Sequence, residues 1–347
     1  MTQSHSGQGT ADLATPQGRL AAAARIPAPG YDRSRLTVGI AHLGTGAFHR
    51  AHQAMYLDRL LRDGETRDQA LSWGICGIDV MPGDQPKHRQ FHAQDCCYTL
   101  VVKQPDGTTE PRVIGSIRDY RYAPDEPGRV LDLLTSPRTR IVSLTITEGG
   151  YCVNQVTGEF EPSSPGIQAD LRPGAVPGTA FGLITEALAR RRADGVPPFT
   201  VMSCDNIQGN GDVAAAMLAA FATLRDPGLG DWIRAEVAFP NSMVDRITPV
   251  TTAEDIERLR AEHGVRDRLT VVCEPFAQWV IQDHFPLGRP PWERCGARLV
   301  SDVTPFELMK LRLLNASHQA MAYAGYLAGY RYAHEVADDP VFAEFLL

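Results

Sequence analysis

The chain has 347 residues, 43% of them hydrophobic and 22% charged, which is typical of a globular protein of about two domains. Its 34 basic and 41 acidic residues give a net charge of −7, so the sequence lacks the cationic surplus that nucleic-acid binding requires. No apolar run approaches the ~20 residues that span a bilayer, and the N-terminus has no basic signal-peptide region.

The first 34 residues are rich in Gly, Pro, Ser, Ala and Gln and show no sustained period. This composition predicts a flexible or loosely docked N-terminal extension.

Short apolar runs rich in β-branched residues then alternate with helical patterns. The runs lie at residues 36–43, 73–78, 141–146, 199–204 and 269–273, and a predicted helix at 47–62 follows the first of them. Such runs are typical of strands covered on both faces. Residues 35–299 therefore predict an α/β domain, a Rossmann-like, mostly parallel sheet with helices on both faces. Residues 98–103 and 112–117 predict an antiparallel hairpin inserted in that series.

The pattern changes near residue 300. A long helical pattern without proline covers residues 306–330 and predicts the start of a mainly α-helical second domain over 300–347. The chain ends on the apolar stretch 341–347, and a helix that nothing covers is a poor terminus, so we expect the sequence to be incomplete.

The seven cysteines are odd in number, and most lie in apolar runs. Cysteine there behaves as a small buried hydrophobe, so we expect free thiols and a reducing cytoplasm. Because the sequence has no heptads, we expect a monomer.

A glycine turn follows the first predicted strand and opens the first predicted helix. It reads Gly44-Thr-Gly46-Ala47-Phe48-His49-Arg50. Glycines at such a strand–helix junction permit a tight turn and a close approach of the backbone to a pyrophosphate. The third glycine of the usual G-x-G-x-x-G pattern is His49 here. The placement still favours a dinucleotide site over a plain turn.

Two acids lie just beyond the second predicted strand, Asp79 and Asp84. A carboxylate there can accept hydrogen bonds from the adenosine ribose and repel a 2′-phosphate, which favours NAD over NADP. Either acid can instead cap the turn around Pro82-Gly83. Farther along, Glu148-Gly149 follow the strand at 141–146. Their backbone can approach the nicotinamide, or they can form a simple loop. His49 and His52 lack further ligands at metal-binding spacing, so we expect no zinc.

The predicted helix after residue 300 carries four polar residues on an otherwise apolar surface. At about 100° per residue, with Lys310 at 0°, Glu307 lies near 60°, His318 near 80° and Asn315 near 140°. A lysine whose pKa is depressed by desolvation can take the proton of an alcohol as hydride leaves, and the amide and imidazole can stabilise the oxygen. Equally, Lys310 can extend to solvent while Asn315 and His318 bond to backbone groups.

Two further polar stretches are candidates for the same site. Asn206 follows the strand at 199–204, where active sites of α/β proteins gather, and Asp245-Arg246 follow Val244. Asp245 and Arg246 can instead form a structural ion pair.

These segments together resemble the polyol-specific long-chain dehydrogenase/reductase family, whose members include mannitol 2-dehydrogenases. The resemblance runs from about residue 36 to the end and rests on ordered matches, which are residues 42–52, 143–151, 201–206, 239–247, 273–276 and 307–318. It implies an NAD-dependent, zinc-independent enzyme that interconverts a polyol and a ketose, such as D-mannitol and D-fructose.

The resemblance also implies individual roles. It makes Lys310 the general base, Asn315 and His318 the groups that position the reacting oxygen, and Glu307 a proton relay. It makes Asn206, Val244 and Asp245 substrate contacts and Asp84 the NAD-selecting acid. Gly83 departs from the glutamate often found before that acid, and family members continue beyond residue 347.

Two other functions remain open from the sequence. One is a hexuronate reductase of the same family, acting on fructuronate or tagaturonate, in which Arg246 would hold the substrate carboxylate. The other is a non-catalytic NAD-binding module, whose second domain is cut short.

Overall fold

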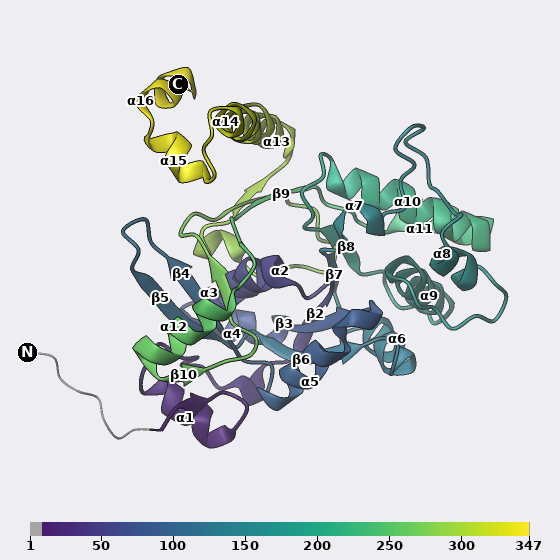
Figure 1. Cartoon of the computed structure of the whole chain (residues 1–347). Coiled ribbons are helices and arrows are strands. Elements are labelled where there is room, and N and C mark those ends of the chain that lie inside the picture. The colour runs from purple at the N-terminus through teal and green to yellow at the C-terminus, as the bar shows by residue number, and fades with distance from the viewer. Residues whose placement is uncertain (1–8, 347) are drawn as a thin grey trace, which may run out of the picture. The chain divides into compact units, whose positions relative to one another are not determined.

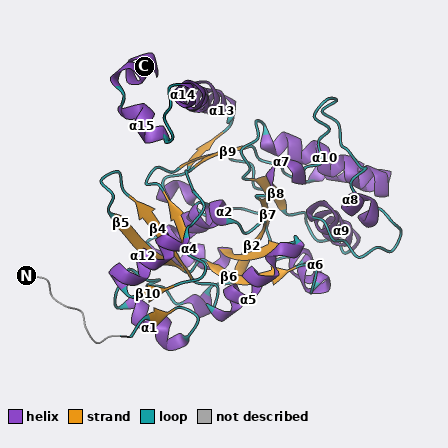
Figure 2. Cartoon of the chain, viewed as in Figure 1, coloured by secondary structure: helices purple, strands orange, loops and turns teal. Residues whose placement is uncertain are grey.

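A computed structural model describes residues 9–346 of the chain. The chain divides into two compact units, one ending at Leu299 and the other beginning at Val300. Figure 1 follows the chain through both units, and Figure 2 marks their helices and strands. Within residues 9–346, no helix is long and apolar enough to cross a membrane.

A five-stranded sheet forms the centre of the first unit. Its strand order is β6-β3-β2-β7-β8, and every neighbouring pair is parallel. The strands are β2 (Val38–Leu43), β3 (Gly74–Asp79), β6 (Ile117–Tyr122), β7 (Ile141–Leu144) and β8 (Thr200–Ser203). Four of the five predicted apolar runs form four of these strands, and the predicted Rossmann-like fold is confirmed.

The fifth strand, β6, is a finding of the structure. Its buried Ile117, Tyr120 and Tyr122 alternate with half-buried charged residues, as an edge strand with one solvent-facing side allows. Because the charges interrupt the apolar run, the sequence pattern placed residue 117 at the end of the hairpin instead.

Helices cover both faces of this sheet. Ile40 packs into one hydrophobic cluster with residues of α3, whereas its neighbour Ala41 packs into a second cluster with residues of α9 and α10. Alternate side chains of a strand point to opposite faces, so each face has its own core. The helices of this unit are α1 (Pro16–Ala23), α2 (Ala47–Ala51), α3 (Gln53–Arg62), α4 (Arg67–Ala70), α5 (Gln85–Ala93), α6 (Pro127–Thr135), α7 (Thr147–Gly150), α8 (Pro165–Asp170), α9 (Ala180–Ala193), α10 (Asn210–Arg225), α11 (Pro227–Glu236) and α12 (Ala253–His263).

The helix predicted at 47–62 is broken in two at His52, where φ is −116° and ψ is −96°. The His52 ring is fully buried; its Nε2 lies 3.1 Å from the carbonyl oxygen of Gln278, and its centroid lies 5.1 Å from that of Trp279. These tertiary contacts hold the residue outside helical geometry.

A second sheet has the order β11-β4-β5. The predicted hairpin forms from β4 (Tyr98–Lys103) and β5 (Thr109–Ile114), with the return strand three residues earlier than predicted. Strand β11 (Val271–Cys273) pairs in parallel with β4. The prediction that this last apolar run continues the main parallel sheet is therefore wrong.

A third sheet has the order β13-β12-β9 and carries two of the predicted site residues. Its strands are β9 (Ser242–Asp245), β12 (Gln278–Gln282) and β13 (Arg298–Val300). Strand β9 contains Val244 and Asp245, and Arg246 follows it directly.

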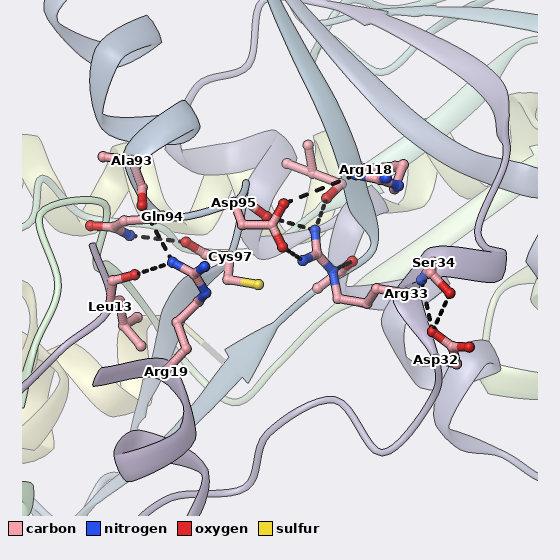
Figure 3. A network of polar contacts seen from close by, with 12 residues as sticks. Leu13, Arg19, Asp32, Arg33, Ser34, Ala93, Gln94, Asp95, Cys97 and Arg118 are labelled. Carbon is pink, nitrogen blue, oxygen red and sulfur yellow. Dashed lines mark hydrogen bonds and ion pairs between the residues drawn. The ribbon is translucent and has the colours of Figure 1, made fainter. Parts of the chain in front are cut away.

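The predicted loose extension is a packed segment over residues 9–34. Strand β1 (Ala11–Asp12) pairs with β10 (Val265–Arg266), and Leu13 is fully buried. Figure 3 shows how arginines fasten the segment: Arg19 donates to the carbonyl oxygens of Leu13 and Ala93, and Arg33 pairs with Asp95 at 2.5 Å. The correction has a physical reason, because small apolar residues here fill a satellite core. Residues 1–8 lie outside the described part of the chain.

The second unit is helical. It contains α13 (Thr304–Met309), a π-helical segment (Lys310–Asn315), α14 (Ala316–Leu327), α15 (Ala333–Asp338) and α16 (Pro340–Leu346). Gly325 allows α14 and α15 to approach, since a Cβ there would lie 2.4 Å from a methyl group of Val336. Tyr326 and Leu327 are 80% and 85% exposed, so much of the apolar surface of α14 is not covered within the described residues.

Candidate functional site

The glycine turn joins β2 to α2 as predicted. Gly44 has a φ of +92°, and a Cβ there would lie 2.0 Å from the carbonyl oxygen of Thr145. Gly46 has a φ of −78°, and the nearest atom to a Cβ there, the Gly44 carbonyl oxygen, lies at 3.9 Å. The first glycine is thus required by the fold, whereas the second leaves its backbone open to a ligand.

A cavity of about 500 Å³ opens beside this turn, at the carboxyl ends of β2, β3 and β7. Ligands of open α/β sheets bind at this edge. The predicted residues that line the cavity are Gly44, Asp79, Asp84 and Gly149. A larger hollow of about 730 Å³ lies at the start of β2, lined by Leu36–Val38 and several arginines. That hollow is at the opposite end of the strands, so the smaller cavity is the candidate site.

Asp79 holds the glycine turn in place. Its side chain is 2% exposed, and its carboxylate accepts hydrogen bonds from the Thr45 backbone N–H at 2.7 Å and from the Tyr120 hydroxyl. The Lys87 ammonium lies 2.5 Å away. Burial and the Asp79 charge raise the pKa of Tyr120 above its ordinary value. Asp84 is 27% exposed, so it is the more accessible carboxylate for a ribose.

His49 and Arg50 lie beneath the turn. The His49 ring stacks on His42 with 3.4 Å between centroids, and desolvation lowers the pKa of both imidazoles, that of His42 to about 3. Arg50 donates to the carbonyl oxygens of Leu269 and Gly46. Neither side chain lines the cavity; Phe48, likewise outside its lining, stacks on the His52 ring.

His42 belongs to a buried polar chain that the sequence did not reveal. Its Nδ1 lies 2.8 Å from the hydroxyl of Ser143, which donates to Gln53, and its Nε2 lies 2.8 Å from the hydroxyl of Thr145. The Thr145 hydroxyl donates to the Gly44 carbonyl oxygen at 2.6 Å. These hydrogen bonds connect β2 to β7 and hold the Gly44 carbonyl group of the glycine turn in place.

The segment that contains Glu148 and Gly149 is held by Asp205. The Asp205 carboxylate accepts from the backbone N–H groups of Ile146 at 3.0 Å and Thr147 at 2.9 Å, and from the Tyr151 hydroxyl at 2.7 Å. Thr147 has a φ of +62°, which is unusual for a residue other than glycine. Burial raises the pKa of Asp205. Sequence reasoning missed this residue, although it directly precedes Asn206.

Asn206 is exposed beyond the end of β8, and Asp245 is half-buried at the end of β9. Buried Asn210 connects the two strands, because its side-chain amide donates to the carbonyl oxygens of Ser203 at 3.3 Å and Ser242 at 2.7 Å. Val244 is not at the surface; it is 3% exposed and belongs to the hydrophobic core.

Arg246 is 6% exposed, and its guanidinium donates to the carbonyl oxygens of Ala51 at 2.7 Å and Glu274 at 3.2–3.3 Å. Burial lowers its pKa. Its hydrogen bonds to the backbone tie β9 to α2.

The polar helix of the second unit contains Glu307 in α13, Lys310 at the start of the π-helical segment, Asn315 at its end and His318 in α14. Glu307, Lys310 and Asn315 are half-buried, and His318 is exposed. A π-helical turn advances less per residue than an α-helical turn, because its hydrogen bonds span one more residue. The π-helical segment therefore changes the angle between Lys310 and Asn315 from the value that an α-helix would give.

Two protein-family models match this chain. The mannitol dehydrogenase Rossmann domain matches residues 38–294, and the mannitol dehydrogenase C-terminal domain matches residues 302–347. The chain belongs to the mannitol dehydrogenase family. The resemblance identified from the sequence is thereby confirmed.

The curated relatives that this chain matches are named mannitol dehydrogenases. The chain is 48% identical over 324 residues to a mannitol 2-dehydrogenase of Phaeosphaeria nodorum, covering 92% of this chain and 56% of that protein. It is 45% identical over 322 residues to a mannitol dehydrogenase of Saccharomyces cerevisiae, covering 92% and 63%. The chain thus spans less than two thirds of the length of these curated relatives.

Two solved structures have the same fold. One is a Pseudomonas fluorescens mannitol 2-dehydrogenase in a ternary complex with NAD and D-mannitol, with a TM-score of 0.86 and 49% identity. The other is a substrate-free D-sorbitol dehydrogenase, with a TM-score of 0.88 and 43% identity. Each match covers 93% of this chain, and it covers 65% and 66% of the respective structure.

Proposed function

We propose that this chain carries an NAD-dependent, zinc-independent oxidoreductase that interconverts D-mannitol and D-fructose by hydride transfer. The observation that carries the proposal is the match, over 93% of the chain at 49% identity, to a structure that holds NAD and D-mannitol. Within residues 9–346, no group of three or more His, Cys, Asp or Glu side chains is placed to hold a metal ion. The proposed chemistry uses Lys310 as the base.

The cavity beside the glycine turn fits a dinucleotide. Its volume of about 500 Å³ lies within the ordinary range of ligand sites, and the backbone at Gly46 is open to a pyrophosphate. Asp84 would accept hydrogen bonds from the adenosine ribose, and the Thr147–Gly150 segment would lie along the nicotinamide half. A bound nicotinamide supplies the hydride acceptor.

The remaining residues would handle the substrate oxygen and its proton. Lys310 takes the proton of the reacting hydroxyl, while Asn315 and His318 donate hydrogen bonds to the oxygen that becomes the carbonyl. Glu307 passes the proton on to water. The placement of these four groups within one short stretch of helix supports this division of roles. Asn206 and Asp245 would hold other substrate hydroxyls, and Val244 would support them from the core.

The hexuronate alternative receives less support. A substrate carboxylate calls for a cation with free donors. Arg246, the candidate for that role, directs its guanidinium to backbone carbonyls of Ala51 and Glu274. A polyol has no charge to neutralise, so the polyol proposal needs no such clamp.

Replacing Lys310 tests the proposed base. The chain has only three lysines, and Lys103, which pairs with Asp255 at 2.6 Å on the hairpin, provides the matched control. We expect Lys310→Met to lower the rate of mannitol oxidation on the order of 10³-fold with NADH binding unchanged, and Lys103→Met to change neither. Because the base must be unprotonated, the wild-type rate should rise with pH to a plateau. An equal rate in Lys310→Met would refute the assignment.

The same assay separates the alternatives. Mannitol, sorbitol, arabinitol and fructuronate are offered side by side, with and without a chelator. Turnover of the uronate alone would replace the polyol proposal, and loss of activity with the chelator would contradict zinc independence. NADH binding without any turnover would identify a non-catalytic binding module.

We further propose a cytoplasmic monomer. All seven cysteines are free thiols, which suits a reducing compartment.

A further inference from the structure

Lys87 lies between Asp79 and Asp84, two carboxylates of the candidate cofactor cavity. It is in the first turn of α5, and its ammonium is 2.5 Å from Asp79 and 3.1 Å from Asp84. Asp79 and Asp84 both line the cavity. Lys87 is not itself among the lining residues, and its side chain is 23% exposed, so it is partly accessible to solvent beside the two carboxylates.

The two carboxylates are not equivalent partners for this lysine. Asp79 is buried, and it also binds the Thr45 backbone N–H and the Tyr120 hydroxyl. The Asp79 carboxylate is therefore occupied by contacts within the protein. Asp84 is 27% exposed at a longer distance from the ammonium. Both side chains of this pair are partly open to solvent, which weakens the ion pair, so an anionic ligand can replace Asp84 as the partner of Lys87.

Space for such a ligand exists next to Asp84. A Cβ built on Gly83 would meet no atom within 4 Å, and Met81, which lines the cavity, is 64% exposed. A ribose held by Asp84 would thus have open volume beside its 2′ position. Two acids at this place repel a 2′-phosphate, and the Lys87 ammonium between them offsets one of their two charges and so reduces that repulsion.

We propose that Lys87 determines the dinucleotide specificity of this chain by accepting a 2′-phosphate, so that the chain binds NADP(H) as well as NAD(H). The inference rests on the proposed function, because it places the adenosine ribose in the same cavity. With NAD, Asp84 accepts from the ribose hydroxyls. With NADP, the phosphate takes the place of Asp84 beside the Lys87 ammonium.

Fluorescence titration of NADH and NADPH tests the inference without turnover. We expect the dissociation constants of the wild-type chain for the two dinucleotides to differ by less than about 10-fold. Lys87→Met should weaken NADPH binding at least 10-fold more than it weakens NADH binding. Lys103→Met, which removes an ammonium from another carboxylate pair, should change neither.

A second variant covers the case in which Lys87→Met fails to fold because Asp79 loses its partner. Asp84→Asn keeps the lysine and removes the competing charge, so it should tighten NADPH binding about 10-fold. In addition, ε-¹³C-lysine labelling gives signals from only three lysines, and the Lys87 signal should shift further with NADPH than with NADH.

The outcomes are distinct. If the wild-type chain binds neither dinucleotide, the proposed function fails and the Lys87 inference falls with it. If NADH binds but NADPH does not, the inference alone is overturned. It is also overturned if Lys87→Met folds and keeps the wild-type ratio of affinities, or if the Lys87 signal responds equally to both dinucleotides.

Discussion

Alanine substitutions at the two glycines of the turn separate a structural requirement from a functional one. Gly44 has a φ of +92°, a left-handed conformation that costs a residue with a Cβ roughly 1–2 kcal/mol. The new Cβ would also lie 2.0 Å from the Thr145 carbonyl oxygen, so the turn or β7 must shift, which costs about 1–3 kcal/mol more. Gly44→Ala should therefore lose about 2–5 kcal/mol of unfolding free energy.

Gly46→Ala is the matched control for the fold. Its φ of −78° suits any residue, and a Cβ there meets no atom closer than 3.9 Å. We expect its melting temperature to lie within about 1 °C of wild type, whereas Gly44→Ala should melt about 4–20 °C lower, at roughly 2–4 °C per kcal/mol. If a pyrophosphate packs on this backbone, Gly46→Ala should still weaken NADH binding at least 10-fold.

Thermal unfolding of both variants tests the predicted change in stability, and NADH titration tests the predicted change in cofactor affinity. Equal melting temperatures for Gly44→Ala and wild type would refute the steric reasoning. Unchanged NADH affinity in Gly46→Ala would show that the phosphates do not approach this turn, and the cofactor site would have to lie elsewhere.

Two further predictions concern buried groups. Asp205→Asn puts an amide group against N–H donors and so weakens the contacts that hold the Thr147 backbone at its positive φ. We expect a loss of about 1.5–3 kcal/mol of unfolding free energy and weaker NADH binding, whereas the exposed control Asp212→Asn should change neither. Wild-type NADH affinity in Asp205→Asn would contradict the positioning role. Burial keeps His42 neutral in the folded state by lowering its pKa to about 3. As the pH falls below about 6.5, the histidine is protonated in the unfolded state but not in the folded state. The unfolding free energy therefore falls by about 1.4 kcal/mol per pH unit between about pH 6.5 and pH 3. Urea unfolding at pH 7 and pH 5 should show a smaller drop for His42→Gln than for wild type or for the exposed control His334→Gln, and equal drops in all three would refute the burial argument.

Local patterns predicted the strands better than their pairing. The apolar runs located β2, β3, β7 and β8, because a strand buried on both faces needs apolar residues at nearly every position. The same rule missed β6, an edge strand with charges on its outer side. It also assigned the run at 269–273 to the wrong sheet, since the pairing of Val271 with Leu100 is not encoded locally.

The site residues divide in the same way, into those that a local pattern predicts and those that depend on contacts between distant segments. The glycine turn, the acids at and just beyond the end of β3 and the polar helix after residue 300 were recognisable from residue type and spacing. Asp205 and Asn210 were not, because their role depends on backbone groups of other strands. The π-helical segment was also invisible, although it changes the angle between Lys310 and Asn315.

The amino-acid order alone determined where the fully buried strands of the main sheet lie, where the chain turns on glycine, and which family the protein belongs to. Only the tertiary structure decided which polar groups are already committed to the fold. Asp79 and Asp84 read alike in the sequence, yet Asp79 bonds to Tyr120, 41 residues away, and Asp84 keeps an exposed carboxylate. Likewise Arg246 donates to Ala51, 195 residues away. A buried polar group must find a partner, and folding chooses that partner by proximity in space rather than along the chain.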